Sequence, residues 1–545
     1  MGSLRLLVTD EIDPDGVDLL RVEPSFIVDE IPTPKPAELL EKIGDYDAFV
    51  GRSATRLPAE VLRRATKLRV IGRAGVGTDN IDIPAATQLG IAIINAPGGN
   101  TVAVAELFFG ALIGLIRHLP DAASSMREGR WDRSKLLGTE LRGRSLGIVG
   151  LGRIGSEVAL RARAFGMSLC AYDPYVTDER FEMLRVSRSK TLEDLLKASD
   201  VVTVHTPLNP ETTGMIAANE IGVLKRGSIV VNMARGGIVE EKALTNALES
   251  GFLGGAILDV YTQEPLDPSS ALRKLPNVVL TPHLGASTEE GQHNVAVDVC
   301  AAVRDALLSG ELSRAINVVG GLDGRWDEIR PALVLTRRMA AIGRAMLADR
   351  GSRAVDAISL RLGRDLTEAG NLLVASAAAG ALDSIIDGVR LNLVNARALA
   401  ENRGIALTVA TSHSVPDNGA QVTVRCGRNE VVIAGSAPAG SGPRVTRIDG
   451  FIVDVTPRRT LLVLTNADVP GVIGRVGTLL GDARVNIAEY HQARLTRGGD
   501  ALAAVSVDGE ITEEVRQKLL NLPDIKSATA IDFIRLDAAG EEVWT

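Results

Sequence analysis

Short apolar runs alternate with helical patterns over the first 95 residues of the chain. We predict strands at residues 6–8, 48–50, 70–72 and 91–94, separated by segments in which apolar residues recur at helical spacing. Such alternation is typical of a parallel, doubly wound α/β sheet. A glycine-rich loop at 96–100 then leads into a long predicted helix from Thr101 to about Arg117.

A second α/β run begins at Ser145. Its predicted strands are 146–149, 168–172, 201–204, 229–232, 256–258 and 278–280, and its predicted helices are 153–165, 192–197, 219–224 and 240–250. A further helical stretch, from beyond His283 to about Ser309, is needed to complete the first domain. The expected fold class is therefore α/β, with a Rossmann-like parallel-sheet domain inserted in a flavodoxin-like one.

The character of the sequence changes beyond Asn317. Residues 325–353 form a basic, amphipathic helical pattern, which we interpret as a helix with a solvated face rather than a nucleic-acid patch. A helix near 372–402, strands at 421–424 and 431–434, a hairpin loop at 435–443 and a boundary at 455–457 predict an α+β domain. The last segment reads strand 461–464, helix 472–480, strands 488–493 and 502–507, helix 513–521 and strand 529–534. This βαββαβ order predicts a ferredoxin-like module.

Composition narrows the functional classes. A chain of 545 residues is expected to form several domains, and a net charge of −8 argues against a general nucleic-acid binder. Cys170, Cys300 and Cys426 are scattered without metal-ligand spacing, so we expect no metal site and a reducing, cytoplasmic location. The longest apolar stretch, residues 107–116, is about half a membrane span, so no membrane partner is expected.

A glycine-rich turn follows the predicted strand 146–149 and opens a helix. Gly150 permits a tight turn, Gly152 lets a pyrophosphate approach the backbone, and Gly155 lets the helix pack closely on the strand. The bare GxGxxG pattern is weak, but its position between a strand and a helix N-terminus favours a dinucleotide site. Asp173 ends the next strand, where a carboxylate accepts hydrogen bonds from ribose hydroxyls and repels a 2′-phosphate, which favours NAD over NADP.

Three further residues follow consecutive predicted strands. Arg235 can bind a carboxylate bidentately, and His283 suits the removal of a hydroxyl proton near neutral pH. Glu264 can orient the imidazole and stabilise its protonated form. Each residue alone is more often structural, but together they indicate hydride transfer to and from a 2-hydroxy acid. His205 also ends a strand, and we interpret it as lining the cofactor cleft.

On these motifs the chain resembles the D-isomer-specific 2-hydroxyacid dehydrogenase family. The matching stretches are GRSAT at 51–55, GRAGVG at 72–77, GIVGLGRIG at 147–155, NMARGG at 232–237 and PHLGAS at 282–287. The resemblance implies that Arg235, Glu264 and His283 are catalytic. It also implies an NAD site lined by Gly150, Gly152, Arg153, Ile154, Gly155, Asp173, His205, Thr206, Pro207, Met233, Ala234, Arg235, Asp259, His283, Gly285 and Ala286.

The substrate residues implied by the resemblance are Arg52, Ser53, Arg73, Ala74, Gly75, Asn100 and Arg133. Gly98 and Gly99 precede Asn100 where Thr-Gly or Thr-Ser is more usual. Arg133 resembles an arginine that reaches across a dimer, which would make a homo-dimer or homo-tetramer part of substrate binding. The implied domains are 1–97 with 282–316 (substrate binding), 98–281 (NAD binding), 317–455 (intervening) and 456–545 (C-terminal).

The tail resembles the long, three-part form of the family. The residues NLVNA at 392–396 and IDG at 448–450 resemble its intervening domain, and LLVL at 461–464, PGVIG at 470–474 and VNI at 485–487 resemble an ACT domain. The implied effector is L-serine. Serine-binding ACT modules carry a histidine and an asparagine before the Pro-Gly, whereas this chain has Asn466 and Asp468; Asn486 matches.

The resemblance implies NAD-dependent oxidation of 3-phosphoglycerate to 3-phosphohydroxypyruvate, the first step of phosphorylated L-serine synthesis. One alternative is a related dehydrogenase that reduces 2-oxoglutarate, glyoxylate or hydroxypyruvate. A more distant alternative, from another class, is an NAD(H)-sensing binding protein similar to corepressors that share this core.

Overall fold

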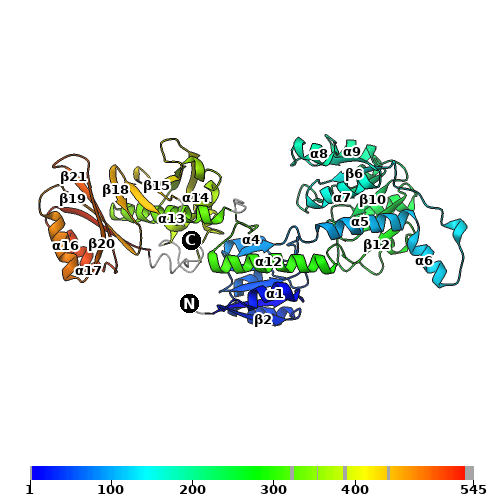
Figure 1. The fold of residues 1–545 in the computed structure, drawn as a ribbon, viewed down its shortest axis with the longest axis horizontal. Helices are drawn as coiled ribbons and strands as arrows, with labels where there is room; N and C mark the ends of the chain where they lie inside the picture. The colour runs from blue at the N-terminus through cyan, green and yellow to red at the C-terminus, as the bar shows by residue number, and fades with distance from the viewer. Residues whose placement is uncertain (1–2, 319–324, 353, 384–389, 439–441, 534–545) are drawn as a thin grey trace. The chain divides into compact units, whose positions relative to one another are not determined.

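The structure is a computed structural model that describes residues 3–318, 325–352, 354–383, 390–438 and 442–533. The chain divides into two compact units: Met1–Asn95 with Val299–Thr545, and Ala96–Asp298. Each unit is described by itself below (Figure 1).

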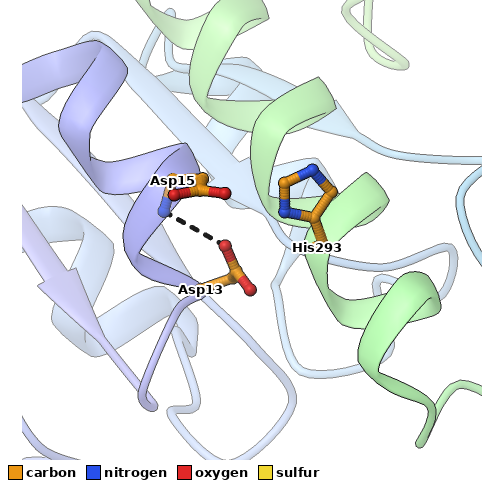
Figure 2. A group of neighbouring side chains, drawn as sticks. All are labelled: Asp13, Asp15 and His293. Carbon is orange, nitrogen blue, oxygen red and sulfur yellow. Dashed lines mark hydrogen bonds between the residues drawn. The ribbon is translucent and has the colours of Figure 1, made fainter.

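The first unit begins with a parallel sheet in the order β2-β1-β3-β4-β5, the flavodoxin-like order. Its strands are β1 (Leu4–Thr9), β2 (Phe26–Ile31), β3 (Ala48–Gly51), β4 (Val70–Arg73) and β5 (Ala92–Asn95). The helices between them are α1 (Pro14–Arg21), α2 (Pro36–Lys42), α3 (Ala59–Arg64) and α4 (Ile83–Gln88). Asp13 caps α1 by accepting a hydrogen bond from the Asp15 N–H, as Figure 2 shows. The sequence pattern missed β2, because this strand lies at the sheet edge, pairs with β1 alone among the described strands, and carries Asp29 and Glu30.

The second unit contains a seven-stranded parallel sheet in the order β12-β11-β10-β9-β6-β7-β8, which confirms the Rossmann-like prediction. Its strands are β6 (Ser145–Val149), β7 (Ser168–Tyr172), β8 (Ser187–Arg188), β9 (Val201–Val204), β10 (Ile229–Asn232), β11 (Gly255–Leu258) and β12 (Val278–Leu280). Its helices are α5 (Thr101–Ile116), α6 (Leu119–Arg127), α7 (Arg153–Ala164), α8 (Asp178–Leu184), α9 (Leu192–Ala198), α10 (Ala218–Gly222) and α11 (Glu241–Glu249), and α12 (Glu289–Ser309) begins in this unit. Strands β9, β10 and β11 are buried at every residue, with separate apolar clusters formed by alternate residues of the central strands.

Among the described residues, no single helix is long and apolar enough to cross a membrane. Helices α5 and α6 meet that test only as a pair, bent by 65° at the break between them.

The intervening part of the first unit is a six-stranded sheet with helices packed on it. Its strands are β13 (Ala357–Leu362), β14 (Ala406–Thr411), β15 (Gly419–Cys426), β16 (Asn429–Ser436), β17 (Arg444–Ile448) and β18 (Phe451–Val455), and its helices are α13 (Trp326–Asp349), α14 (Gly370–Leu382) and α15 (Ala396–Asn402). The prediction that α13 has a solvated face is wrong. Arg337 is buried beside Asp383, and Arg338 lies over the Phe533 ring, because α13 packs against α14, its own sheet and β22. The single helix expected near 372–402 is also wrong, since α14 ends at Leu382 and α15 begins at Ala396.

The C-terminal module has the predicted βαββαβ order. It consists of β19 (Thr460–Ala467), α16 (Val472–Asp482), β20 (Ile487–Arg494), β21 (Asp500–Val507), α17 (Glu513–Leu520) and β22 (Ile525–Asp532), with sheet order β20-β21-β19-β22. The ferredoxin-like prediction is confirmed.

Two asparagines join the intervening part to the first sheet. The side-chain amides of Asn392 and Asn395 donate to the carbonyls of Gly90 and Gln88, at 2.7 and 3.3 Å. Gly90 has φ +72°, and a Cβ there would lie 2.9 Å from both amide nitrogens. Both asparagines are buried, so each hydrogen bond is shielded from water. The turn before β5 is therefore a fixed attachment point that requires glycine.

We predict that Gly90→Ala destabilises this attachment more than Gly404→Ala does. Both glycines have positive φ after a helix, but nothing lies within 4 Å of a Cβ at Gly404, so that variant reports backbone strain alone. The steric conflict with two amides at Gly90 should add about 1–3 kcal/mol. Hydrogen exchange at residues 390–396, measured with thermal unfolding, should rise only in Gly90→Ala. Equal behaviour of the two variants would contradict this role.

Candidate active site and cofactor site

The glycine-rich loop between β6 and α7 has the shape expected of a dinucleotide cradle. Gly150 has φ +92°, and a Cβ there would lie 2.8 Å from the His205 carbonyl oxygen. A Cβ at Gly155 would overlap the Gly150 carbonyl, whereas nothing lies within 4 Å of a Cβ at Gly152. Gly152 precedes α7, whose N-terminal amides and dipole favour an anion. The loop therefore has open space on the side where a pyrophosphate is expected.

Asp173 is held against this loop. Its Oδ2 accepts from the Leu151 N–H at 2.8 Å, and its Oδ1 accepts from the Tyr175 N–H at 3.0 Å. The carboxylate is thus fixed just beyond β7, the position from which an acidic residue binds the ribose in such folds. Arg153 and Ile154 begin α7 directly after the loop.

His205, Thr206 and Pro207 follow β9, the strand next to β6. The His205 Nε2 lies 3.0 Å from the Thr203 Oγ1, and the ring lies edge-on to Phe108. The His205 Nδ1 and the Thr206 Oγ1 are buried without a hydrogen-bond partner among the described residues. Burial lowers the pKa of His205 to about 4, so the imidazole is neutral at physiological pH. A neutral ring that borders the glycine loop fits the predicted cleft-lining position rather than acid–base work.

The three predicted catalytic residues follow the ends of three adjacent strands. In the sheet register Asn232 pairs with Leu258, and Leu258 pairs with Leu280, so β10, β11 and β12 end at one edge. Glu264 follows β11 and His283 follows β12. The His283 Nδ1 lies 2.8 Å from the Glu264 Oε2, and the other oxygen, Oε1, accepts from the Tyr261 N–H. Because an ionised carboxylate only accepts, Nδ1 carries the proton and Nε2 is left to face a substrate.

Arg235 lies beyond β10, next to the Glu264 loop. The Asn232 side chain donates to the Arg235 carbonyl, which fixes the turn, and the Arg235 guanidinium donates to the Ala234 carbonyl at 2.7 Å. A Cβ at Gly236 would overlap the carbonyl of Tyr261, so only glycine lets these two loops approach so closely. Met233 and Ala234 complete this strand end.

A buried carboxylate holds the loop that carries His283. Asp259 is fully buried and accepts three hydrogen bonds, from the Thr281 hydroxyl, the Leu284 N–H and the Gly285 N–H, at 2.6 to 2.8 Å. The Tyr261 hydroxyl also donates to the Thr281 carbonyl at 2.8 Å, and burial, with Asp259 nearby, raises the pKa of Tyr261 to about 12. The loop can therefore hold His283 at φ +56°. Sequence reasoning placed Asp259 and Gly285 at the cofactor but missed this anchoring, for which the only signal was an acidic residue directly after an apolar strand.

The predicted substrate loops of the first unit are also anchored by a buried acid. Asp10, at the end of β1, accepts from the Arg52 N–H, the Thr55 N–H and the Thr55 hydroxyl at 2.6 to 3.0 Å. The loop of Arg52 and Thr55 follows β3. It is linked to the loop after β4, because the N–H of Ala74 there donates to the Gly51 carbonyl. Asp10 was missed by the sequence analysis, although it too directly follows an apolar strand.

The remaining predicted substrate residues are distributed over both units. Arg73 folds back over Gly75, whose φ is +146°, so a Cβ at that position would overlap the guanidinium. Ser53 is exposed and Ala74 is buried in the same pair of loops. In the second unit, Asn100 precedes α5 with its Oδ1 buried and unpartnered among the described residues, and Arg133 is exposed in the segment after α6.

Of the three predicted effector residues, Asn466 and Asp468 lie at the carboxyl end of β19 and Asn486 lies just before β20. Asn466 is buried, and its Oδ1 has no hydrogen-bond partner among the described residues. The Asp468 carboxylate accepts from the Gly498 N–H and from Arg494, which lower its pKa. Asn486 donates to Asp508 at 2.6 Å. The Asn466 side-chain nitrogen donates to the Ala467 carbonyl, so all three residues are engaged within the described module and only the Asn466 Oδ1 is left open there.

Comparison with known proteins agrees with this geometry. Residues 109–285 match the NAD-binding domain of D-isomer specific 2-hydroxyacid dehydrogenases, and residues 460–524 match the ACT domain. The chain is 38% identical over 531 residues to D-3-phosphoglycerate dehydrogenase of Synechocystis sp., covering 97% of this chain and 94% of the relative. It is also 38% identical over 532 residues to D-3-phosphoglycerate dehydrogenase of Bacillus subtilis, covering 97% and 99%. A glyoxylate reductase structure from Paecilomyes thermophila aligns with TM-score 0.54 and 32% identity, over 58% of this chain and 99% of that one.

The fold, the glycine loop and the His–Glu pair define an NAD-dependent dehydrogenase of 2-hydroxy acids. The chain belongs to the D-isomer specific 2-hydroxyacid dehydrogenase family, and within it to the D-3-phosphoglycerate dehydrogenases that carry an ACT domain.

We predict that His205 makes the stability of the protein fall as the pH is lowered. An unfolded imidazole titrates near pH 6.5, whereas the folded one titrates at about 4, so only the unfolded chain takes up this proton between those values. The free energy of unfolding should therefore decrease from pH 6.5 downward. The Tm measured at pH 7.5, 6 and 5 should fall less steeply in His205→Gln than in wild type. His413→Gln, at an exposed position, should keep the wild-type slope; identical slopes in all three proteins would argue against a buried, neutral His205.

Proposed function

We propose that the chain oxidises 3-phosphoglycerate to 3-phosphohydroxypyruvate with NAD, the first step of phosphorylated L-serine synthesis, in the cytoplasm. The observation that carries the proposal is the 2.8 Å pair of His283 and Glu264 at the strand edge that also carries Arg235. The chain aligns with two relatives over almost their full length, and both are named D-3-phosphoglycerate dehydrogenase, which supports 3-phosphoglycerate as the substrate.

Each side chain has a distinct task in this reaction. Arg235 binds the substrate carboxylate through its planar, permanently charged guanidinium. The His283 Nε2 accepts the C2 hydroxyl proton while Nδ1 stays bonded to Glu264, which stabilises the imidazolium that forms. When bound, NAD supplies the acceptor for the C2 hydride. In the reverse reaction His283 returns the proton to the carbonyl oxygen.

The residues present fit NAD better than NADP. The open face of Gly152 and the N-terminus of α7 would hold the pyrophosphate, and the Asp173 carboxylate would bind the ribose hydroxyls. The same fixed negative charge would repel a 2′-phosphate.

The substrate phosphate requires additional cations. Arg52 and Arg73 supply them from the loops after β3 and β4, and Ser53 and the Gly75 backbone amide add neutral hydrogen-bond donors. Asn100 lies at the start of α5, where its buried, unpartnered Oδ1 can accept from a substrate hydroxyl.

We propose a homo-oligomer in which Arg133 contributes to a neighbouring subunit's site. The segment around it exposes large apolar side chains, with Trp131 77% and Leu137 88% exposed. Such patches mark protein contacts. L-serine at the ACT domain is the proposed effector, and the buried, unpartnered Asn466 oxygen supports a polar ligand there.

The alternative substrates are 2-oxoglutarate, glyoxylate and hydroxypyruvate. The similarity to a glyoxylate reductase over the catalytic portion keeps glyoxylate as a second candidate. An NAD(H)-sensing binding protein could keep the His–Glu pair, and it is disfavoured instead by the ACT domain at residues 460–524. Following NADH formation with 3-phosphoglycerate, against a panel of these acids, separates the three possibilities.

We predict that His283→Ala lowers kcat for 3-phosphoglycerate by about 10²–10⁴-fold, because the general base is lost. NADH binding, followed by fluorescence, should be retained. Unimpaired turnover would remove the role assigned to His283.

Glu264→Gln should move the acid limb of the oxidation profile to lower pH. Without the carboxylate the imidazolium loses its stabilising partner, so the neutral base persists in more acidic solution. The pH dependence of kcat/KM checks this shift. A limb that stays in place would show that the two groups are not coupled.

Arg73→Ala should lower kcat/KM for 3-phosphoglycerate by about 10- to 100-fold, since a charge-assisted contact to phosphate is lost. The loss for glyoxylate should be much smaller. Arg56→Ala, an exposed arginine that follows the first substrate loop, should leave both substrates unchanged. Equal losses for the two substrates would argue against phosphate recognition by Arg73.

A further inference from the structure

The intervening sheet ends at an unprotected strand. Strand β14 lies at the edge of the order β14-β13-β15-β16-β17-β18 and, within the described residues, pairs in parallel with β13 alone. All but one of its six residues are exposed, and Val409 is 40% exposed. Edge strands of stable proteins are usually shielded by charges, proline or a bulge, because an open edge invites pairing with another strand.

Two backbone hydrogen bonds fix which residues point outward. The Ala406 N–H donates to the Asp356 carbonyl and the Ser412 N–H donates to the Leu362 carbonyl, both at 2.9 Å. Even-numbered residues of β14 therefore direct their backbone toward β13. The backbone N–H and C=O groups of Leu407, Val409 and Thr411 therefore face away from β13, and no strand in the described part of the chain pairs with that side.

The sequence of β14 does nothing to prevent pairing. Ala-Leu-Thr-Val-Ala-Thr contains no charge and no proline, and it follows a regular parallel register without a bulge. The opposite edge of the same sheet differs. There β18 carries Asp454, which is paired with Arg444, and β18 packs against β20. Of the two edges of this sheet, as far as the structure describes them, the β14 edge alone is both open and uncharged.

We propose that β14 pairs antiparallel with β14 of a second copy of this chain, across a two-fold axis at Val409. The outward residues then match as Val409 with Val409, and Leu407 with Thr411. Each of these three residues gains backbone hydrogen bonds, and no like charges meet across the axis, which self-pairing requires.

Side-chain burial favours the same arrangement. Val409 already packs over Gly370 of α14, where an added Cβ would lie 2.9 Å from its Cγ1. The exposed part of Val409 is therefore the part along the edge, and a second Val409 would cover it. This makes one sheet of twelve strands across two subunits.

A strand pair of this length buries less surface than the ~1,200–2,000 Å² of a typical stable interface. The β14 contact is therefore a second interface that joins subunits already associated elsewhere. This second contact rests on the homo-oligomer of the proposed function and is distinct from the Trp131 segment.

The test is the mass of the full-length protein by light scattering, in the absence of substrate. Val409→Lys places two like charges at the axis and should reduce the assembly to half the wild-type mass. Ile452→Lys, on the opposite edge and 79% exposed in the described structure, is the matched control and should leave the mass unchanged. Turnover of 3-phosphoglycerate, measured separately, should persist in Val409→Lys, so a failed assembly test and a failed functional assignment give different results.

A second measurement needs no variant. In wild type, hydrogen exchange should be slow at the amides of Leu407, Val409 and Thr411 as well as at the even-numbered amides bonded to β13. Rapid exchange at the three outward amides, a monomeric wild type, or a Val409→Lys protein of wild-type mass would each overturn the proposal.

Discussion

The arrangement of the active site depends on one buried carboxylate. Asp259 has no exposure to water, and its charge is satisfied by two backbone amides and one hydroxyl of the loop at 281–285. In a low-dielectric interior such charge-assisted bonds are strong, and removing a donor leaves an uncompensated charge. The loop therefore has one stable arrangement, and His283 is held at φ +56° beside Glu264.

A buried acid also holds a loop at the edge of the first sheet. Asp10 follows β1 as Asp259 follows β11, and each carboxylate accepts from two backbone amides of a neighbouring loop. Parallel strands bring their carboxyl ends to one edge, and an acid just beyond the edge then orders the loops there. Ligand-binding side chains can thus be carried on loops and still be precise in position.

How far the sequence predicts this structure depends on whether the signal is local. The strands β6, β9, β10 and β11 are continuous apolar runs, so their order and the residues at their ends follow from the pattern. Burial from tertiary packing is not local. The sequence of helix α13 has an amphipathic pattern, yet Arg337 is buried against α14. The pattern within α13 holds no information about this neighbouring helix. Likewise, β2 is recognised as a strand from its pairing with β1, which its own sequence does not predict.

The intervening part of the chain attaches to the first sheet at two turns: Asn392 and Asn395 bind the turn before β5, and Arg390 donates to the carbonyl of Leu68 before β4. β5 begins just after Gly90, where Asn392 and Asn395 attach, and it ends at Asn95, whose amide donates to the Val76 carbonyl at 2.6 Å. Within β5, the Asn317 side chain accepts from the Ile93 N–H. A buried, doubly bonded strand transmits a displacement rather than absorbing it. A rearrangement of the intervening part at Gly90 would therefore either break buried hydrogen bonds or displace β5 and, through Asn95, the loop of Gly75 and Val76.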